Sequence, residues 1–139
     1  MNKIHELYYR LNALYIFYKS VHLLSKSLNF YQNHKFFGEL YEKIDDELDA
    51  LAELTLAFDE SDKAFDAKTI LEQSSKLAQP TANKFIDNIK LASEQELAII
   101  ELIDDLQVNK IPAGLYNHIA SIAQNHSRNS YLLSRINEK

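Results

Sequence analysis

The stretch HKFFGELYEKIDDELDALAE, residues 34–53, decides the fold because its apolar side chains recur at helical spacing. Steps of three or four residues mark one face of an amphipathic helix. In and just beyond this stretch, that face carries Phe37, Leu40, Ile44, Leu48, Leu51 and Leu54. The pattern predicts one long helix from about Tyr31 to Phe58.

Three more long segments show the same periodicity. The first, from about Ile4 to Ser27, has its apolar face at Leu7, Leu11, Leu14, Phe17, Val21 and Leu24. Pro80 suits the first turn of a helix and predicts a third segment that runs to about Gln107. The fourth covers about Pro112 to Ile136. A brief helix is expected at residues 68–76, KTILEQSSK, within the connection between the second and third segments.

Two helices, a long connection and two further helices predict an all-α, ferritin-like four-helix bundle, with the short helix inside the crossover. The 139 residues fit a single domain, 1–139, with a sizeable core. Two glycines and two prolines are too few for an all-β protein with many tight turns. We find no internal repeat and no domain linker.

Composition narrows the chemistry and the compartment. The chain has no cysteine, which excludes disulfides, thiolate zinc sites, iron–sulfur clusters and a cysteine nucleophile. The N-terminal residues lack the apolar core of a signal peptide, and no run of 18 apolar residues predicts a membrane span. We therefore expect a cytoplasmic protein. A net charge of −5 and the lack of a long basic tail predict weak DNA binding or none.

Four residues are candidate metal ligands. Asp49 and Glu53 are four residues apart, so they share one helix face, where a solvated acidic surface is the alternative interpretation. His22 and His34 are each six residues from Leu28. If the turn between the first two helices centres on Leu28, the two histidines become neighbours across antiparallel helices.

One chain cannot join the histidines to the carboxylates. His34 and Asp49 are 15 residues apart, which is about 22 Å along a helix. They nevertheless lie within about 60° of each other around its axis. A twofold axis near Tyr41 and Glu42 would bring His34 of one subunit to Asp49 of another, with two equivalent sites per dimer. Imidazole and carboxylate ligands together suit iron(II), zinc or manganese.

These residues resemble the Dps family, the small ferritin-like proteins of bacteria that form hollow shells. Its members typically carry histidine, histidine, an acidic residue and Glu at intervals of 12, 15 and four residues, as His22, His34, Asp49 and Glu53 do here. The resemblance extends to TILEQSS at residues 69–75 and to the segment 111–136, so it covers nearly the whole chain. It implies a homo-oligomer of 12 subunits that binds Fe(II) between subunits, oxidises it with hydrogen peroxide as a ferroxidase, and stores Fe(III) as mineral.

The sequence departs from the family at two places near these ligands. Gly38 stands where the family usually has a further acidic ligand, which favours one iron per site over two. Leu23 follows His22, and the chain has no tryptophan beside the site. The chain also has no Glu-x-x-His motif of the kind that builds a metal site within one bundle, which favours the site between subunits.

Two other functions compete with iron oxidation. A structural Dps-like shell protein with a degenerate ferroxidase site would explain Gly38, and a non-enzymatic helical adaptor would be monomeric. His118 and His126 lie about two helical turns apart, too far for one ion, so they are interpreted as structural or surface residues. Tyr41 is a hypothetical quencher of oxidising radicals.

Overall fold

The computed structural model describes residues 2–26 and 29–137, and no described residue is in a strand. Its helices occur in the order α1 (Lys3–Leu24), α2 (Phe30–Phe58), α3 (Ala67–Leu77), α4 (Phe85–Asp104) and α5 (Ala113–Asn137). Two 3₁₀ turns, η1 (Asp62–Phe65) and η2 (Val108–Lys110), lie in the connections. The predicted all-α architecture is confirmed.

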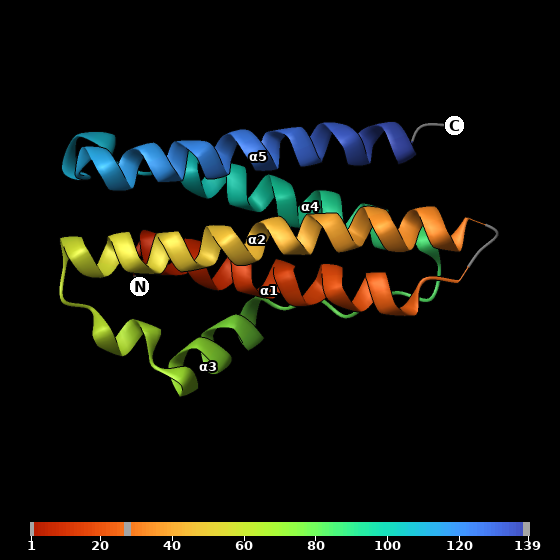
Figure 1. Cartoon of the computed structure of the whole chain (residues 1–139), viewed down its shortest axis with the longest axis horizontal. Helices are drawn as coiled ribbons and strands as arrows, with labels where there is room; N and C mark the ends of the chain where they lie inside the picture. Colours follow the sequence, from red (N-terminus) through yellow and green to blue (C-terminus); the bar gives the residue numbers. More distant parts are fainter. Residues whose placement is uncertain (1, 27–28, 138–139) are drawn as a thin grey trace.

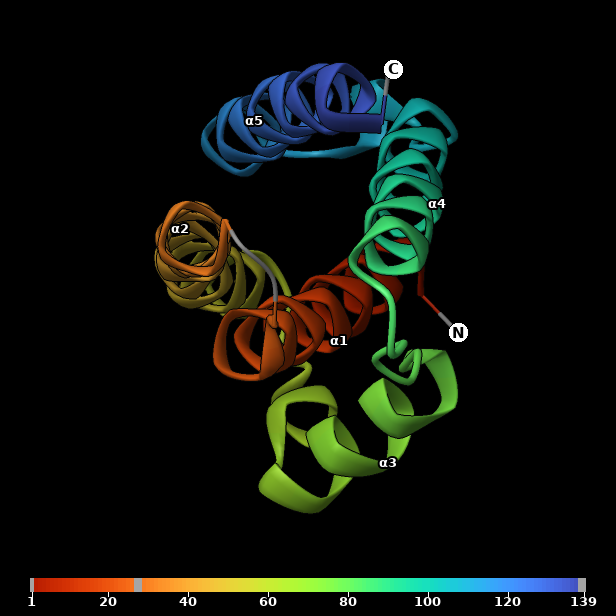
Figure 2. The same cartoon turned by 90° about the vertical axis from the view of Figure 1, so that its right-hand side faces the viewer.

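Four long helices form the bundle, and α3 lies outside it against α1 (Figure 2). Around the bundle, α1 contacts α2 and α4, and α5 contacts the same two helices. The crossover leaves the end of α2, includes α3, and returns the chain to the opposite end of the bundle before α4 begins (Figure 1). This is the predicted connection with a short helix inside it.

The core is formed by the predicted apolar faces. Every predicted core residue of the first two helices is buried or partly buried, except Leu24. Leu24 is 60% exposed and is the last residue of α1. The first helix was predicted to continue to about Ser27, but α1 ends at Leu24 and Ser25 is already outside it. Ser27 and the proposed turn centre Leu28 lie outside the described residues.

The prediction that the third long helix begins at Pro80 is also wrong, because α4 begins at Phe85. A side chain within α4 holds the preceding segment out of the helix. The amide of Asn88 accepts a hydrogen bond from the Ala82 N–H at 2.7 Å and donates one to the Ala82 carbonyl at 3.1 Å. Asn88 thus satisfies both backbone groups of a residue that is not helical.

Replacing Asn88 with alanine is expected to lower the free energy of unfolding by about 1–3 kcal/mol, because both backbone groups of Ala82 lose their hydrogen-bond partner, which is buried. Urea denaturation followed by circular dichroism measures this loss. Asn83→Ala, at an exposed position in the same connection, is the control and should have little effect. An equal loss of unfolding free energy in Asn88→Ala and Asn83→Ala would show that the hydrogen bonds of Asn88 do not stabilise the fold.

Within the described residues, no helix is both long and apolar enough to cross a membrane.

Candidate metal centre

His22 and His34 lie side by side where α1 ends and α2 begins. Their rings are stacked, with centroids 3.6 Å apart and planes inclined by 19°. The prediction that the two histidines are neighbours across the first two helices is therefore confirmed. Both side chains are half-buried.

Each histidine ring bonds to the backbone of the other. His22 Nδ1 lies 2.5 Å from the carbonyl oxygen of His34, and His34 Nδ1 lies 2.7 Å from that of His22. A carbonyl oxygen only accepts, so both Nδ1 atoms must carry the hydrogen. In the neutral rings, the lone pair is then on Nε2. Histidines that bind metals are commonly held in this way, with the non-ligating nitrogen bonded to a carbonyl or a carboxylate.

The end of α1 explains one of these two contacts. The last four carbonyls of a helix have no partner within it, and the His22 carbonyl is among them because α1 ends at Leu24. The His34 ring supplies the missing donor. The ring therefore caps α1 and at the same time fixes its own Nε2 as the nitrogen with the lone pair.

Asp49 and Glu53 are exposed on α2, near its other end. The helix is continuous from Phe30 to Phe58, so the separation of about 22 Å between His34 and Asp49 holds in the fold. Burial and then the negative charge of Asp49 raise the pKa of the Tyr8 hydroxyl on α1. Within the described residues, no group of three or more histidine and acidic side chains is arranged to hold a metal ion. One chain therefore brings the two histidines together but keeps them apart from the two carboxylates.

Tyrosines lie beside the histidine pair. The Tyr41 ring meets His22 edge-on, with centroids 5.3 Å apart, and Tyr15 meets Tyr41 in the same way at 5.6 Å. Tyr41 is thus in ring contact with a candidate ligand, and its role as a radical quencher stays a hypothesis.

A second group of polar residues lies in the bundle core, and the sequence interpretation missed its arrangement. His126 of α5 is fully buried between Glu96 of α4 and Glu47 of α2. Its Nδ1 lies 2.5 Å from Glu96, and its Nε2 lies 2.8 Å from Glu47. His126 was expected to be structural or on the surface, and its full burial shows that it is structural. We call Glu47, Glu96 and His126 the core triad.

Further donors complete the hydrogen bonds of the core triad. Glu96 Oε2 accepts bonds from the Tyr18 hydroxyl at 2.5 Å and from the Asn129 amide at 3.2 Å. Glu47 Oε2 accepts one from the Asn125 amide at 3.1 Å. The two carboxylates lie on different nitrogens of one imidazole ring, so no single ion can contact all three side chains in this arrangement. The core triad is a buried ion network and not a metal site.

The two carboxylates decide the charge of His126. Burial alone would lower the pKa of the imidazole, but the charge of Glu96 and the hydrogen bonds that the ring donates to both carboxylates raise this pKa to about 10. The ring is therefore an imidazolium at neutral pH and donates from both nitrogens. A fully hydrogen-bonded arrangement of this kind is what a charged group needs in a core.

The raised pKa of His126 predicts a pH dependence of stability. The folded state holds this proton more tightly than the unfolded chain does, so the stabilisation is complete below about pH 6.5 and is lost toward about pH 10. We expect the free energy of unfolding to fall by on the order of 3 kcal/mol between about pH 6.5 and 9. Urea denaturation at a series of pH values measures the slope. His126→Gln should remove most of it, and an unchanged slope in this variant would contradict the assignment.

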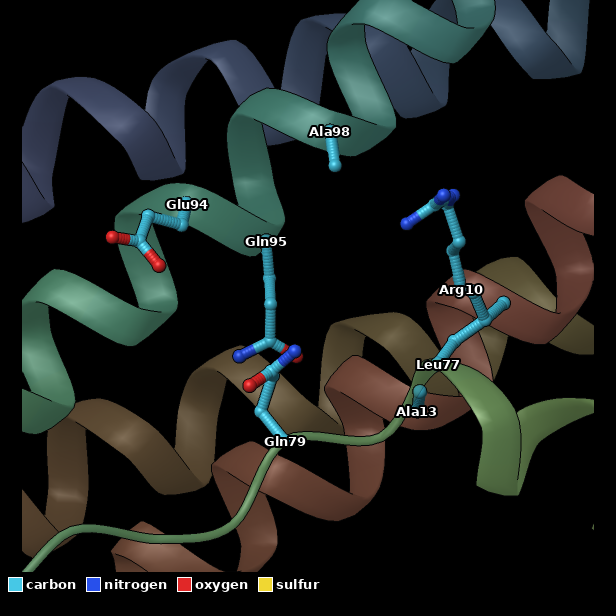
Figure 3. Close-up of a pocket in the computed structure, with 7 residues that line it drawn as sticks. All are labelled: Arg10, Ala13, Leu77, Gln79, Glu94, Gln95 and Ala98. Atoms are coloured by element: carbon cyan, nitrogen blue, oxygen red, sulfur yellow. The ribbon is translucent and has the colours of Figure 1, made fainter.

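A small pocket lies away from the candidate ligands. It has a volume of about 120 Å³ and is lined by Arg10, Ala13, Leu77, Gln79, Glu94, Gln95 and Ala98 (Figure 3). The Arg10 guanidinium is already paired with Glu6 at 2.9 Å. None of the four predicted ligands lines this pocket, so the two features are separate.

The architecture is that of ferritin-like proteins. Among solved structures, the chain is similar to a DPS protein from Vibrio cholerae O1, described as a member of a broad superfamily of ferritin-like diiron-carboxylate proteins. The TM-score is 0.60 and the sequence identity 16%, over 99% of this chain and 87% of the other. At this identity the similarity establishes the fold. No protein-family model and no curated protein matches the sequence.

Proposed function

We propose that this chain is the subunit of a Dps-like homo-oligomer that binds and oxidises iron(II) between subunits. His22 and His34 of one subunit would meet Asp49 and Glu53 of another across a twofold axis near the middle of α2. The observation that carries the proposal is the reciprocal pairing of the histidines, because it leaves one lone-pair nitrogen on each ring. The carboxylates are exposed at the other end of the same helix, where a second subunit can reach them.

The two half-sites supply complementary chemistry. The Nε2 atoms of His22 and His34 are neutral ligands that suit iron(II). Asp49 and Glu53 add negative charge, which stabilises iron(III) more than iron(II) and therefore favours loss of the electron. With hydrogen peroxide as the oxidant, two iron(II) ions, one at each of two sites, supply two electrons, two protons are taken up, and two water molecules form. A shell of 12 such subunits would then store the iron(III) as mineral.

Anaerobic titration with iron(II), with the oligomeric state measured by sedimentation, tests this proposal. The expected result is an oligomer with saturable binding that is lost in Asp49→Ala. Glu101→Ala removes an exposed carboxylate from α4 and is the matched control. A stable monomer at micromolar concentration would favour a helical adaptor and contradict the proposal.

A structural shell protein without ferroxidase activity is the second candidate. The observation that favours it is Gly38, which offers no ligand where the family that the sequence resembles usually has one. An intact oligomer without saturable iron(II) binding would support this function over iron oxidation.

We expect weak DNA binding or none at physiological salt. The chain has a net charge of −5, so association with DNA gains little from the release of counterions. Gel-shift titration at about 0.15 M salt measures the affinity. A tight complex at this salt concentration would show that a local basic surface outweighs the net charge.

A further inference from the structure

Gly38 lies directly against the ring of His22. A Cβ atom at position 38 would lie 3.0 Å from both Cε1 and Nδ1 of that ring, closer than packed side chains normally approach. Gly38 is buried, and it lies one helical turn beyond His34 on α2. The imidazole of His22 thus occupies the space that a side chain at position 38 would fill.

The shared carbonyl of His34 explains this close approach. In the regular hydrogen-bond pattern of α2, that carbonyl accepts from the N–H of Gly38, four residues later. It also accepts from Nδ1 of His22 at 2.5 Å. To reach this oxygen, the His22 ring must lie over the helix backbone at residue 38, where a Cβ would be in its way. The contact of His34 Nδ1 with the His22 carbonyl has no such constraint. This carbonyl lies in the last turn of α1, which ends at Leu24.

We propose that Gly38 is a positioning residue that keeps His22 paired with His34 and limits the site to one divalent cation per histidine pair. The inference rests on the proposed function, because the cation is held by the Nε2 atoms of the two rings. A carboxylate at position 38 would be on the same face as His34 and could serve a second ion. In this chain the His22 ring fills the space that a carboxylate at position 38 would need. Gly38 therefore lacks a ligand and also makes room for the His22 ring.

The first test measures the number of bound ions with cobalt(II), which is stable in air and gives a visible spectrum when ligated. The wild-type oligomer should bind one cobalt(II) per histidine pair. Gly38→Ala removes no ligand, yet it should weaken binding by roughly 10- to 100-fold, because the ring that it displaces loses its hydrogen-bond partner. Gly38→Asp should weaken binding too and should not add a second ion.

Gly114→Ala is the matched control. Nothing lies within 4 Å of a Cβ at position 114, so this substitution should leave cobalt(II) binding unchanged. The inference would be overturned if Gly38→Ala bound cobalt(II) as tightly as the wild type. It would also be overturned if the wild type or Gly38→Asp bound two ions per histidine pair. Either result would leave the proposed function intact. No cobalt(II) or iron(II) binding by the wild type would overturn both.

The second test examines Gly38 and His22 without any metal. Gly38→Ala should lower Tm in the wild type, because the new Cβ meets the ring. In His22→Ala the ring is absent, and Gly38→Ala should instead raise Tm by roughly 2–8 °C, since alanine is the better helix former. The change of sign distinguishes the contact from a general effect of the substitution. The same sign in both backgrounds would contradict the positioning role.

Discussion

Replacing His126 with glutamine is expected to lower the free energy of unfolding by about 3–5 kcal/mol, the usual cost of removing one partner from a buried ion network. The substitution leaves Glu47 and Glu96 in the core without the positive charge between them. It should therefore destabilise the bundle far more than a surface change would. Urea denaturation at neutral pH measures the difference.

His118→Gln provides the control in the same helix. His118 is partly buried and lies 3.1 Å from one backbone carbonyl, that of Glu47, so its replacement should cost about 1 kcal/mol. A loss below about 1 kcal/mol for His126→Gln as well would contradict the ion network.

A second background separates charge pairing from packing. When Glu47 and Glu96 are both glutamine, no negative charge remains beside position 126, so His126→Gln should cost much less than it does in the wild type. This coupling is what residues in one network show in a double-mutant cycle. An equal cost in both backgrounds would assign the effect to the shape of the histidine side chain.

The second large effect concerns the metal ligands. His34→Ala and Asp49→Ala should each reduce the rate of iron(II) oxidation by at least about 100-fold, since each removes a ligand from the same composite site. Combining them in one chain should add little, because residues that act as a unit give non-additive losses. Stopped-flow absorbance after addition of hydrogen peroxide measures the rate. If the fold reduction in oxidation rate of the double variant equalled the product of the two single reductions, the residues would serve separate sites.

The fold was predictable from the sequence because the apolar spacing marks all four long helices. The errors occur at helix ends, which apolar spacing alone does not mark. Pro80 suits a helix start locally, but the hydrogen bonds of Asn88 to Ala82 hold Ala82 out of the helix, which begins at Phe85. Leu24 continues the spacing of the first helix, yet it is the last residue of α1 and is 60% exposed. Periodicity reports which face of a helix is apolar but not where the helix ends.

The candidate site was predictable only in part. Counting residues from the turn placed His22 beside His34, and helix geometry separated them from Asp49. The hydrogen bonds that orient the two rings depend on the shared carbonyl of His34 and on the space at Gly38, which a sequence does not display. From the sequence, Gly38 was interpreted as a missing ligand, whereas the structure also shows that a Cβ at this position would lie 3.0 Å from the His22 ring.

The residues of the core triad can be recognised in the sequence as polar residues at core positions. Glu47 lies within the apolar face of its helix, next to Leu48 and one turn from Ile44 and Leu51. Glu96 and His126 occupy similar positions on α4 and α5. A charged residue at a core position predicts a buried partner. The identity of the partner depends on how α2, α4 and α5 face one another, so it became clear only in the fold.

The central claim is that the ligands come from two subunits, and a mixed dimer tests it most directly. In a verified heterodimer of His34→Ala and Asp49→Ala chains, both lesions fall in one of the two twofold-related sites and the other site is intact. The number of saturable iron(II) sites should therefore be about half that of the wild type, whereas each mutant homodimer has none. If the four ligands acted within one chain, every site in the heterodimer would be damaged. Absence of recovered iron(II) binding in that heterodimer would contradict the intersubunit site.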